Sequence, residues 1–220
     1  MMKYIKFILH WFQVKLFPSS LIPEQRFSIK ETREEVINNI KQSKNFLEYG
    51  GGWSTKIAAD SGISFLTIES DKNFADYLSK KIVSNSSQII QFVDIGLTSR
   101  WGYPLFFSTS KNSIEKYKTY TEFPFHESTA KNHFDLVMID GRFRVACFFQ
   151  VLINFSKKRI DTKVIFDDFF VDSRRSYQVI FSYIKKFDKH GSVCIIEINK
   201  ENIIKFPSLS DLEEFLEDPT

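Results

Sequence analysis

Short apolar segments alternate along this chain with longer amphipathic ones, and the alternation predicts its secondary structure. A continuous apolar segment bounded by turn residues indicates a buried strand, whereas apolar residues at helical spacing indicate a helix. The predicted strands are residues 44–49, a segment ending at Glu69, and residues 88–93, 134–139, 163–166 and 192–198, with 203–206 as a candidate seventh. The predicted helices are residues 28–42, which begin with the capping-box spacing of Ser28 and Glu31, and residues 54–60, 71–83, 145–155, 175–187 and 211–216.

The order of these elements predicts a doubly wound α/β domain with a mostly parallel, seven-stranded sheet. Strands that alternate with helices form a sheet covered on both faces. The carboxyl ends of parallel strands then lie at one edge of the sheet. We therefore expect five acidic residues at that edge: Glu48, Glu69, Asp94, Asp140 and Asp167.

The size and composition of the chain are those of one globular domain. It has 220 residues, of which 43% are hydrophobic and 26% charged. A net charge of +3, without a long basic segment interleaved with aromatic residues, argues against a nucleic-acid partner. The two cysteines, Cys147 and Cys194, lie in apolar segments, which indicates buried free thiols and a cytoplasmic protein.

Residues 1–27 form a predicted helical extension that precedes the domain of residues 28–220. Residues 1–17 are mostly apolar, but Lys3, Lys6 and His10 recur at helical spacing. This charge argues against a transmembrane span, and no small-residue cleavage site follows. An amphipathic helix of this kind suits peripheral membrane contact. It equally suits packing on the domain or on a second subunit of a homo-oligomer, which we favour.

A glycine-rich turn follows the first predicted strand. Gly50, Gly51 and Gly52 lie between that strand and a helix, and the next strand ends at Glu69. Glycine lets the backbone approach a ligand where a Cβ would collide. A carboxylate at the end of the next strand can accept hydrogen bonds from ribose hydroxyls. The sequence therefore predicts a nucleoside site, the alternative being a structural turn with an unrelated acid downstream.

The same turn narrows the choice of nucleotide. A dinucleotide fingerprint requires a third glycine where this chain has Thr55, which argues against a nicotinamide dehydrogenase. No Gly-x-x-x-x-Gly-Lys-Ser/Thr phosphate loop is present, so hydrolysis of nucleoside triphosphates has no support.

The acid-x-Gly-x-Gly-x-Ser pattern from Glu48 to Ser54 resembles motif I of the class I S-adenosylmethionine-dependent methyltransferases. The resemblance covers residues 44–200 and implies a Rossmann-like methyltransferase fold with S-adenosylmethionine as cofactor. It implies that Glu48 lies near the amino group of the cofactor, Glu69 on the ribose hydroxyls and Asp94 near the adenine amino group. The implied cofactor site comprises Glu48, Gly50, Gly51, Gly52, Trp53, Ser54, Glu69, Ser70, Asp94, Ile95 and Asp140.

Candidate catalytic residues follow the fourth and fifth predicted strands. Asp140 occupies the position where such enzymes place groups facing the transferred methyl. Arg142 and Arg144, at the start of a helix, can bind a phosphate or carboxylate of the acceptor. Alternatively, they pair with the acids of the same edge. Arg174 and Tyr177 follow the fifth strand, where an acceptor can be held, although Tyr177 can equally be a helix-face aromatic.

The spacing of Asp140, Asp167 and Asp168 resembles that of the metal-dependent O-methyltransferases. The resemblance implies a divalent cation, such as Mg²⁺, that would orient an acceptor hydroxyl and lower its pKa. The alternative is that neighbouring arginines neutralise these three carboxylates.

Residues 97–133 interrupt the regular order of elements and show little hydrophobic period. Such an insertion in a compact domain is usually functional or mobile. We expect it either to cover the cofactor edge as a substrate lid or to be a surface excursion.

The sequence thus predicts methyl transfer from S-adenosylmethionine to a small acceptor that is anionic or sugar-like, at oxygen. Aminopropyl transfer is less favoured because Trp53 stands where those enzymes carry an acid. A non-catalytic module that binds a nucleoside, or docks to a membrane or partner, remains the alternative from another class. The interpretation requires Glu48 and Glu69 to face a common cavity.

Overall fold

The computed structural model of the chain describes residues 29–126 and 133–220, together with positions 5, 8, 9, 11, 12, 16 and 22. Most of residues 1–17, and Ser28 of the expected capping box, therefore lie outside the described residues. The contacts of the N-terminal extension and its boundary with the domain stay predictions. Over the described positions, none of the helices combines the length and apolar character that crossing a bilayer requires.

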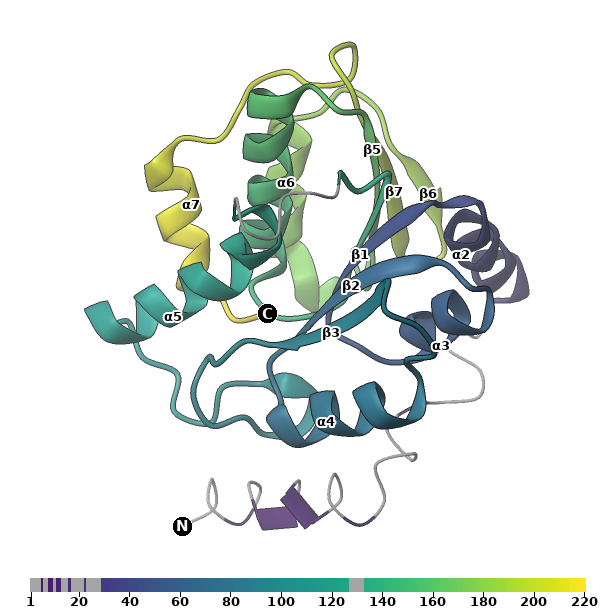
Figure 1. The fold of residues 1–220 in the computed structure, drawn as a ribbon. Coiled ribbons are helices and arrows are strands. Elements are labelled where there is room, and N and C mark those ends of the chain that lie inside the picture. The colour runs from purple at the N-terminus through teal and green to yellow at the C-terminus, as the bar shows by residue number, and fades with distance from the viewer. Residues whose placement is uncertain are drawn as a thin grey trace.

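A seven-stranded sheet with the order β3-β2-β1-β4-β5-β7-β6 forms the centre of the molecule (Figure 1). Strands β3, β2, β1, β4 and β5 are mutually parallel, whereas β7 runs antiparallel to both β5 and β6. The expected doubly wound, mostly parallel sheet is confirmed. Its strands are β1 (Asn45–Tyr49), β2 (Ser64–Glu69), β3 (Gln88–Phe92), β4 (Leu136–Ile139), β5 (Thr162–Phe166), β6 (Asp188–His190) and β7 (Val193–Ile198).

Helices cover both faces of the sheet because strand side chains alternate between them. In β1, Phe46 belongs to one hydrophobic cluster, whereas Leu47 and Tyr49 belong to the other. Helices α2 (Lys30–Gln42), α3 (Trp53–Asp60) and α4 (Lys72–Lys81) lie on the Phe46 side. The Leu47 side carries α5 (Lys111–Glu122), α6 (Arg144–Lys158), α7 (Leu209–Leu216) and the 3-10 segment η4 (Asp172–Ser182).

Two expectations about the carboxyl-terminal third are wrong. Residues 203–206 form no strand and contribute only a single bridge between Ile184 and Ile203. The seventh strand is instead β6, a short and largely exposed edge strand whose residues Asp188–His190 carry no apolar signal. The expected helix over 175–187 is the 3-10 segment η4, which is interrupted at Arg174 by non-helical backbone angles.

Helix α2 begins at Lys30, and the expected capping box stays a prediction because Ser28 lies outside the described residues. The N-cap of the helix is Ile29, in an extended conformation and with no capping hydrogen bond.

The described part of the insertion, residues 97–126, contains more regular structure than its sequence indicates. It contains η2 (Arg100–Gly102), α5 and η3 (Phe123–Phe125), and α5 packs against α6. Tyr117 and Tyr120 of α5 are buried, so this half of the insertion belongs to the core. Sequence reasoning missed α5 because most of its residues are polar and its inward face is made of tyrosines rather than aliphatic residues.

The β1 and β4 strands lie side by side at the centre of the sheet, where the chain changes direction along the sheet. Ligands of open α/β sheets bind in the crevice outside the carboxyl ends of the strands at such a point. The turns that follow these two strands meet closely, because a Cβ on Gly50 would lie 2.7 Å from the Gly141 Cα. The fold therefore places the two predicted functional turns beside one another.

Candidate functional site

A cavity of about 430 Å³ opens at the carboxyl ends of β1, β2, β4 and β5. Its volume lies within the range of small-molecule sites in proteins. Most of the residues predicted from the sequence contribute to it, together with several that were not. The lining residues are Gly50, Gly51, Gly52, Trp53, Ser54, Glu69, Ser70, Asp71, Phe74, Trp101, Gly102, Tyr103, Asp140, Gly141, Arg142, Arg144, Asp168 and Arg174.

The glycine turn forms one wall of this cavity. Gly50 has a φ of +86°, a conformation that L side chains rarely adopt, and its N–H donates to the Ile68 carbonyl at 2.8 Å. A Cβ on Gly52 would meet no atom within 4 Å, so space remains open beside this residue. A ligand can therefore lie directly against the backbone between β1 and α3.

Glu69 lies at the end of β2 and faces the cavity, as the sequence predicts. Its carboxylate accepts hydrogen bonds from the backbone N–H groups of Gly51, Ser70 and Asp71, at 3.0, 2.7 and 2.8 Å. Burial raises the pKa of Glu69 to about 7, although these hydrogen bonds act in the opposite direction. The carboxylate is therefore held by one N–H group of the glycine turn and by two N–H groups of the residues that follow β2.

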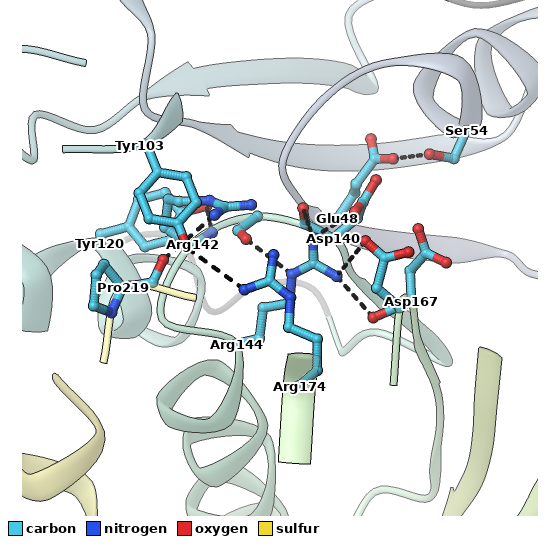
Figure 2. Close-up of polar contacts among 12 residues, drawn as sticks. Glu48, Ser54, Tyr103, Tyr120, Asp140, Arg142, Arg144, Asp167, Arg174 and Pro219 are labelled. Carbon is cyan, nitrogen blue, oxygen red and sulfur yellow. Dashed lines mark hydrogen bonds and ion pairs between the residues drawn. The ribbon is translucent and has the colours of Figure 1, made fainter. Parts of the chain in front are cut away.

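Glu48 does not face the cavity, which corrects the expectation that both carboxylates share one hollow. Its side chain is fully buried beneath the start of α3, where it accepts hydrogen bonds from the hydroxyls of Ser54, Thr55 and Thr67. Figure 2 shows the contact between Glu48 and Ser54. Burial raises the pKa of Glu48 to about 7, against the effect of these hydroxyl donors. Glu48 thus supports the turn from below.

Asp94 and Ile95 are not brought to the cavity either. Asp94 forms an ion pair of 2.7 Å with Lys116 of α5, and the hydrogen bond from this lysine lowers the Asp94 pKa. Ile95 is buried in the hydrophobic core. Neither residue lines the cavity, so their positions do not support the adenine contact expected at this strand end.

Arg144 contacts two of the three acidic residues that follow β4 and β5 through their carboxylates, and the third through its backbone carbonyl. Its guanidinium is buried, lies 2.9 Å from Asp140 and 3.6 Å from Asp168, and donates to the Asp167 carbonyl at 2.7 Å (Figure 2). Burial disfavours its charge, but the neighbouring acids outweigh this effect and raise the Arg144 pKa. Asp140 and Asp168 line the cavity, whereas Asp167 does not. The alternative in which an arginine pairs with the acids of this edge therefore describes Arg144.

Arg142 and Arg174 also line the cavity, but Tyr177 does not. The Tyr177 side chain is fully buried, and its ring centroid lies 4.9 Å from that of Phe166 in the core. The expectation that Tyr177 contacts an acceptor is therefore not supported by its position, and its helix-face alternative is closer to what the structure shows.

Several lining residues were not assigned to the cofactor site from the sequence. Trp101, Gly102 and Tyr103 come from the insertion, while Asp71 and Phe74 begin α4. Gly102 lies close to β2, because a Cβ there would be 2.7 Å from the Ser70 Oγ. For the residues of the insertion, the feature of the sequence that could have indicated them is the segment Trp-Gly-Tyr-Pro at 101–104, in which aromatic residues flank a glycine. This segment of the insertion therefore lies at the cavity, and its role as a substrate lid stays a prediction.

Comparison with solved structures supports the fold. The structure of a methyltransferase-like protein from Silicibacter pomeroyi matches with a TM-score of 0.70 and 23% identity, over 90% of this chain and 100% of that one. The chain has the methyltransferase fold. The cofactor-bound structure of Rv0187 from MTB matches more distantly, with a TM-score of 0.50 and 13% identity over 90% of this chain and 89% of that one. No family model matches the sequence, and no curated relative does.

Proposed function

We propose that this protein binds S-adenosylmethionine and transfers its methyl group to a hydroxyl oxygen of a small acceptor. The observation that carries the proposal is that Glu69 and the Gly50–Gly52 turn face one cavity, at the centre of a sheet with the methyltransferase strand order. Binding requires a carboxylate for the ribose hydroxyls and backbone that a ligand can approach closely, and both lie on the same wall.

The cavity residues suit each part of the cofactor. Glu69 accepts the ribose hydroxyls, and the open space beside Gly52 receives the chain that carries the sulfonium. Ser54 and Ser70 offer hydroxyls on the same side, while Trp53, Phe74 and Trp101 supply aromatic surface for the adenine. This assignment replaces Asp94 and Ile95, which lie away from the cavity, and leaves Glu48 as a support of the turn. The condition that Glu48 and Glu69 face one cavity is therefore not met, and the proposal depends on Glu69 and the glycine turn instead.

Asp140 is the residue placed to act on the acceptor. Its carboxylate lines the cavity, is 20% exposed, and is held by the ion pair with Arg144. When bound, S-adenosylmethionine supplies an activated methyl group, and its sulfur keeps the electron pair of the broken carbon–sulfur bond. Asp140 accepts a hydrogen bond from the acceptor hydroxyl, aligns its oxygen with that methyl group and receives the proton as the new carbon–oxygen bond forms.

A divalent cation at Asp140, Asp167 and Asp168 competes with Arg144 for the same place. The three carboxylates offer oxygen atoms that lie within 4.8 Å of one another, which is close enough for one cation. The Arg144 guanidinium, however, already contacts two of them, and a cation added beside it would be repelled. We infer that Arg144 supplies the positive charge here, so no catalytic step depends on a metal.

Titration calorimetry with S-adenosylmethionine, S-adenosylhomocysteine and NAD⁺ tests the proposed function. We expect the first two to bind and NAD⁺ not to bind. Binding of NAD⁺ alone would overturn the proposal. If none of the three compounds binds, a docking module would be favoured. Incubation of a metabolite extract with methyl-labelled cofactor would then identify the acceptor.

A further inference from the structure

Arg142 is a buried arginine that forms no ion pair with a carboxylate of the described residues. It follows β4, its side chain lines the cavity, and the residue is only 4% exposed. Within residues 29–126 and 133–220, no carboxylate lies within the 4.0 Å of an ion pair with it. Its Nη1 donates to the Pro219 carbonyl at 3.4 Å, and its buried Nε has no hydrogen-bond partner. Burial and the adjacent charge of Arg144 both lower its pKa.

Arg142 and Arg144 differ in whether a carboxylate pairs with their charge. Arg144 lies two residues further on, and Asp140 and Asp168 neutralise its charge. Taking a cation out of water without a paired counter-charge is unfavourable in proteins, and Asp140, beyond ion-pair distance, offsets this only in part. The Arg142 side chain therefore has unused capacity to donate to an anion that enters the cavity.

Arg174 also lines the cavity, from the segment that follows β5, the strand next to β4. It follows β5, in the interrupted segment η4, and its side chain is half-buried. The Tyr103 ring lies against the Arg142 guanidinium, with 4.6 Å between Cζ and the ring centroid, and the Tyr103 hydroxyl accepts a hydrogen bond from Arg174 Nη1 at 3.5 Å (Figure 2). One tyrosine thus positions both cations.

We propose that Arg142 and Arg174, positioned by Tyr103, bind an oxyanion of the methyl acceptor. Guanidinium groups bind carboxylates and phosphates through paired N–H donors, so the acceptor belongs to the carboxylated or phosphorylated metabolites. The two arginines follow β4 and β5, whereas Glu69 ends β2 and the glycine turn follows β1, so the proposed anion contacts come from other elements than the proposed nucleoside contacts. This inference rests on the proposed function.

Calorimetry with inorganic phosphate and with succinate, at constant ionic strength, tests the site in the free protein. Constant ionic strength is needed because salt screens exposed charges. We expect one of the two anions to bind. The substitution Arg174→Gln should lower the affinity for this anion by about 10-fold or more, because a charge-assisted hydrogen bond is lost. Arg175→Gln is the matched control, because Arg175 is the exposed neighbour outside the cavity lining.

Arg142→Gln provides a second variant, accompanied by circular dichroism because this residue is buried. Equal anion affinity in the parent and in Arg174→Gln would overturn the proposal, as would equal losses in Arg174→Gln and Arg175→Gln.

Titration of the same variants with S-adenosylhomocysteine separates this inference from the proposed function. We expect Arg174→Gln to leave that affinity unchanged. A loss of S-adenosylhomocysteine affinity in parallel with anion affinity would mean that the arginines hold the cofactor carboxylate, which overturns the acceptor assignment. If the parent binds the anion but no S-adenosyl compound, the proposed function fails while the anion site stands.

Discussion

The Arg144 guanidinium lies 2.9 Å from the Asp140 carboxylate, in a buried ion pair that joins the turn after β4 to the first turn of α6. The same guanidinium donates to the backbone carbonyl groups of Asp140, Gly141 and Asp167. A single side chain therefore neutralises the acids of this edge and holds the backbone that presents Asp140 to the cavity.

Substitution of Arg144 should expose the repulsion between these acids. We expect Arg144→Met to lower the free energy of unfolding by about 3–5 kcal/mol, because one partner of a buried ion pair is removed. Urea denaturation measures the loss, and Mg²⁺ should partly restore the stability of the variant while leaving that of the parent unaffected.

A chelator should not change methyl transfer by the parent. Loss of turnover with the chelator and recovery with Mg²⁺ would show that a metal is used.

Glu69 should determine cofactor affinity. We expect Glu69→Gln to weaken S-adenosylhomocysteine binding by about 1–3 kcal/mol, because hydrogen bonds to a charged acceptor are lost. Glutamine keeps one oxygen as an acceptor for the backbone N–H groups of Ser70 and Asp71, but its NH₂ group cannot accept from Gly51, so circular dichroism should accompany the titration. The control is Asp94→Asn, whose side chain lies at the next strand end but outside the cavity lining. Unchanged affinity in Glu69→Gln would mean that the cofactor lies elsewhere.

Glu48 should make stability depend on pH. Its pKa in the folded protein is about 7, above its ordinary value of 4.5, because of burial. Between these values the folded state binds more protons than the unfolded state, so stability falls as pH rises from about 4.5 to 7. We expect Glu48→Gln to remove its share of this fall, up to about 3 kcal/mol.

Urea denaturation of the ligand-free protein at several pH values measures this effect. Glu213→Gln, on the exposed face of α7, is the control and should behave as the parent does. An identical pH dependence in Glu48→Gln and the parent would contradict the assignment.

Gly50 should tolerate no side chain, and Gly62 provides a matched comparison. Both have positive φ, +86° and +70°, so alanine at either position should cost about 1–2 kcal/mol. Only at Gly50 would the new Cβ also collide with the backbone of Gly141, because no atom lies within 4 Å of a Cβ at Gly62. Thermal denaturation should show a larger loss for Gly50→Ala, together with weaker S-adenosylhomocysteine binding. Equal losses in the two variants would show that the contact between these turns is unimportant.

The sequence predicted six of the seven strands of the sheet, and it predicted that Glu69 at the end of β2 faces the cavity. Periodicity along the chain is a local property, so strands ending at Glu69 and before Asp140 could be recognised without coordinates. Local signals failed where an element is polar, as in β6, or where its buried face is made of tyrosines, as in α5.

The roles of the charged residues were decided by the tertiary structure. Glu69 is the last residue of β2 and reaches the edge of the sheet, whereas Glu48 lies one residue before the end of β1 and points beneath α3. Arg142 and Arg144 look equivalent in the sequence, but only Arg144 meets carboxylates from both β4 and β5. Alternation along a strand follows from chain geometry alone, while the partner of a charge depends on residues that are distant in sequence and adjacent only after folding.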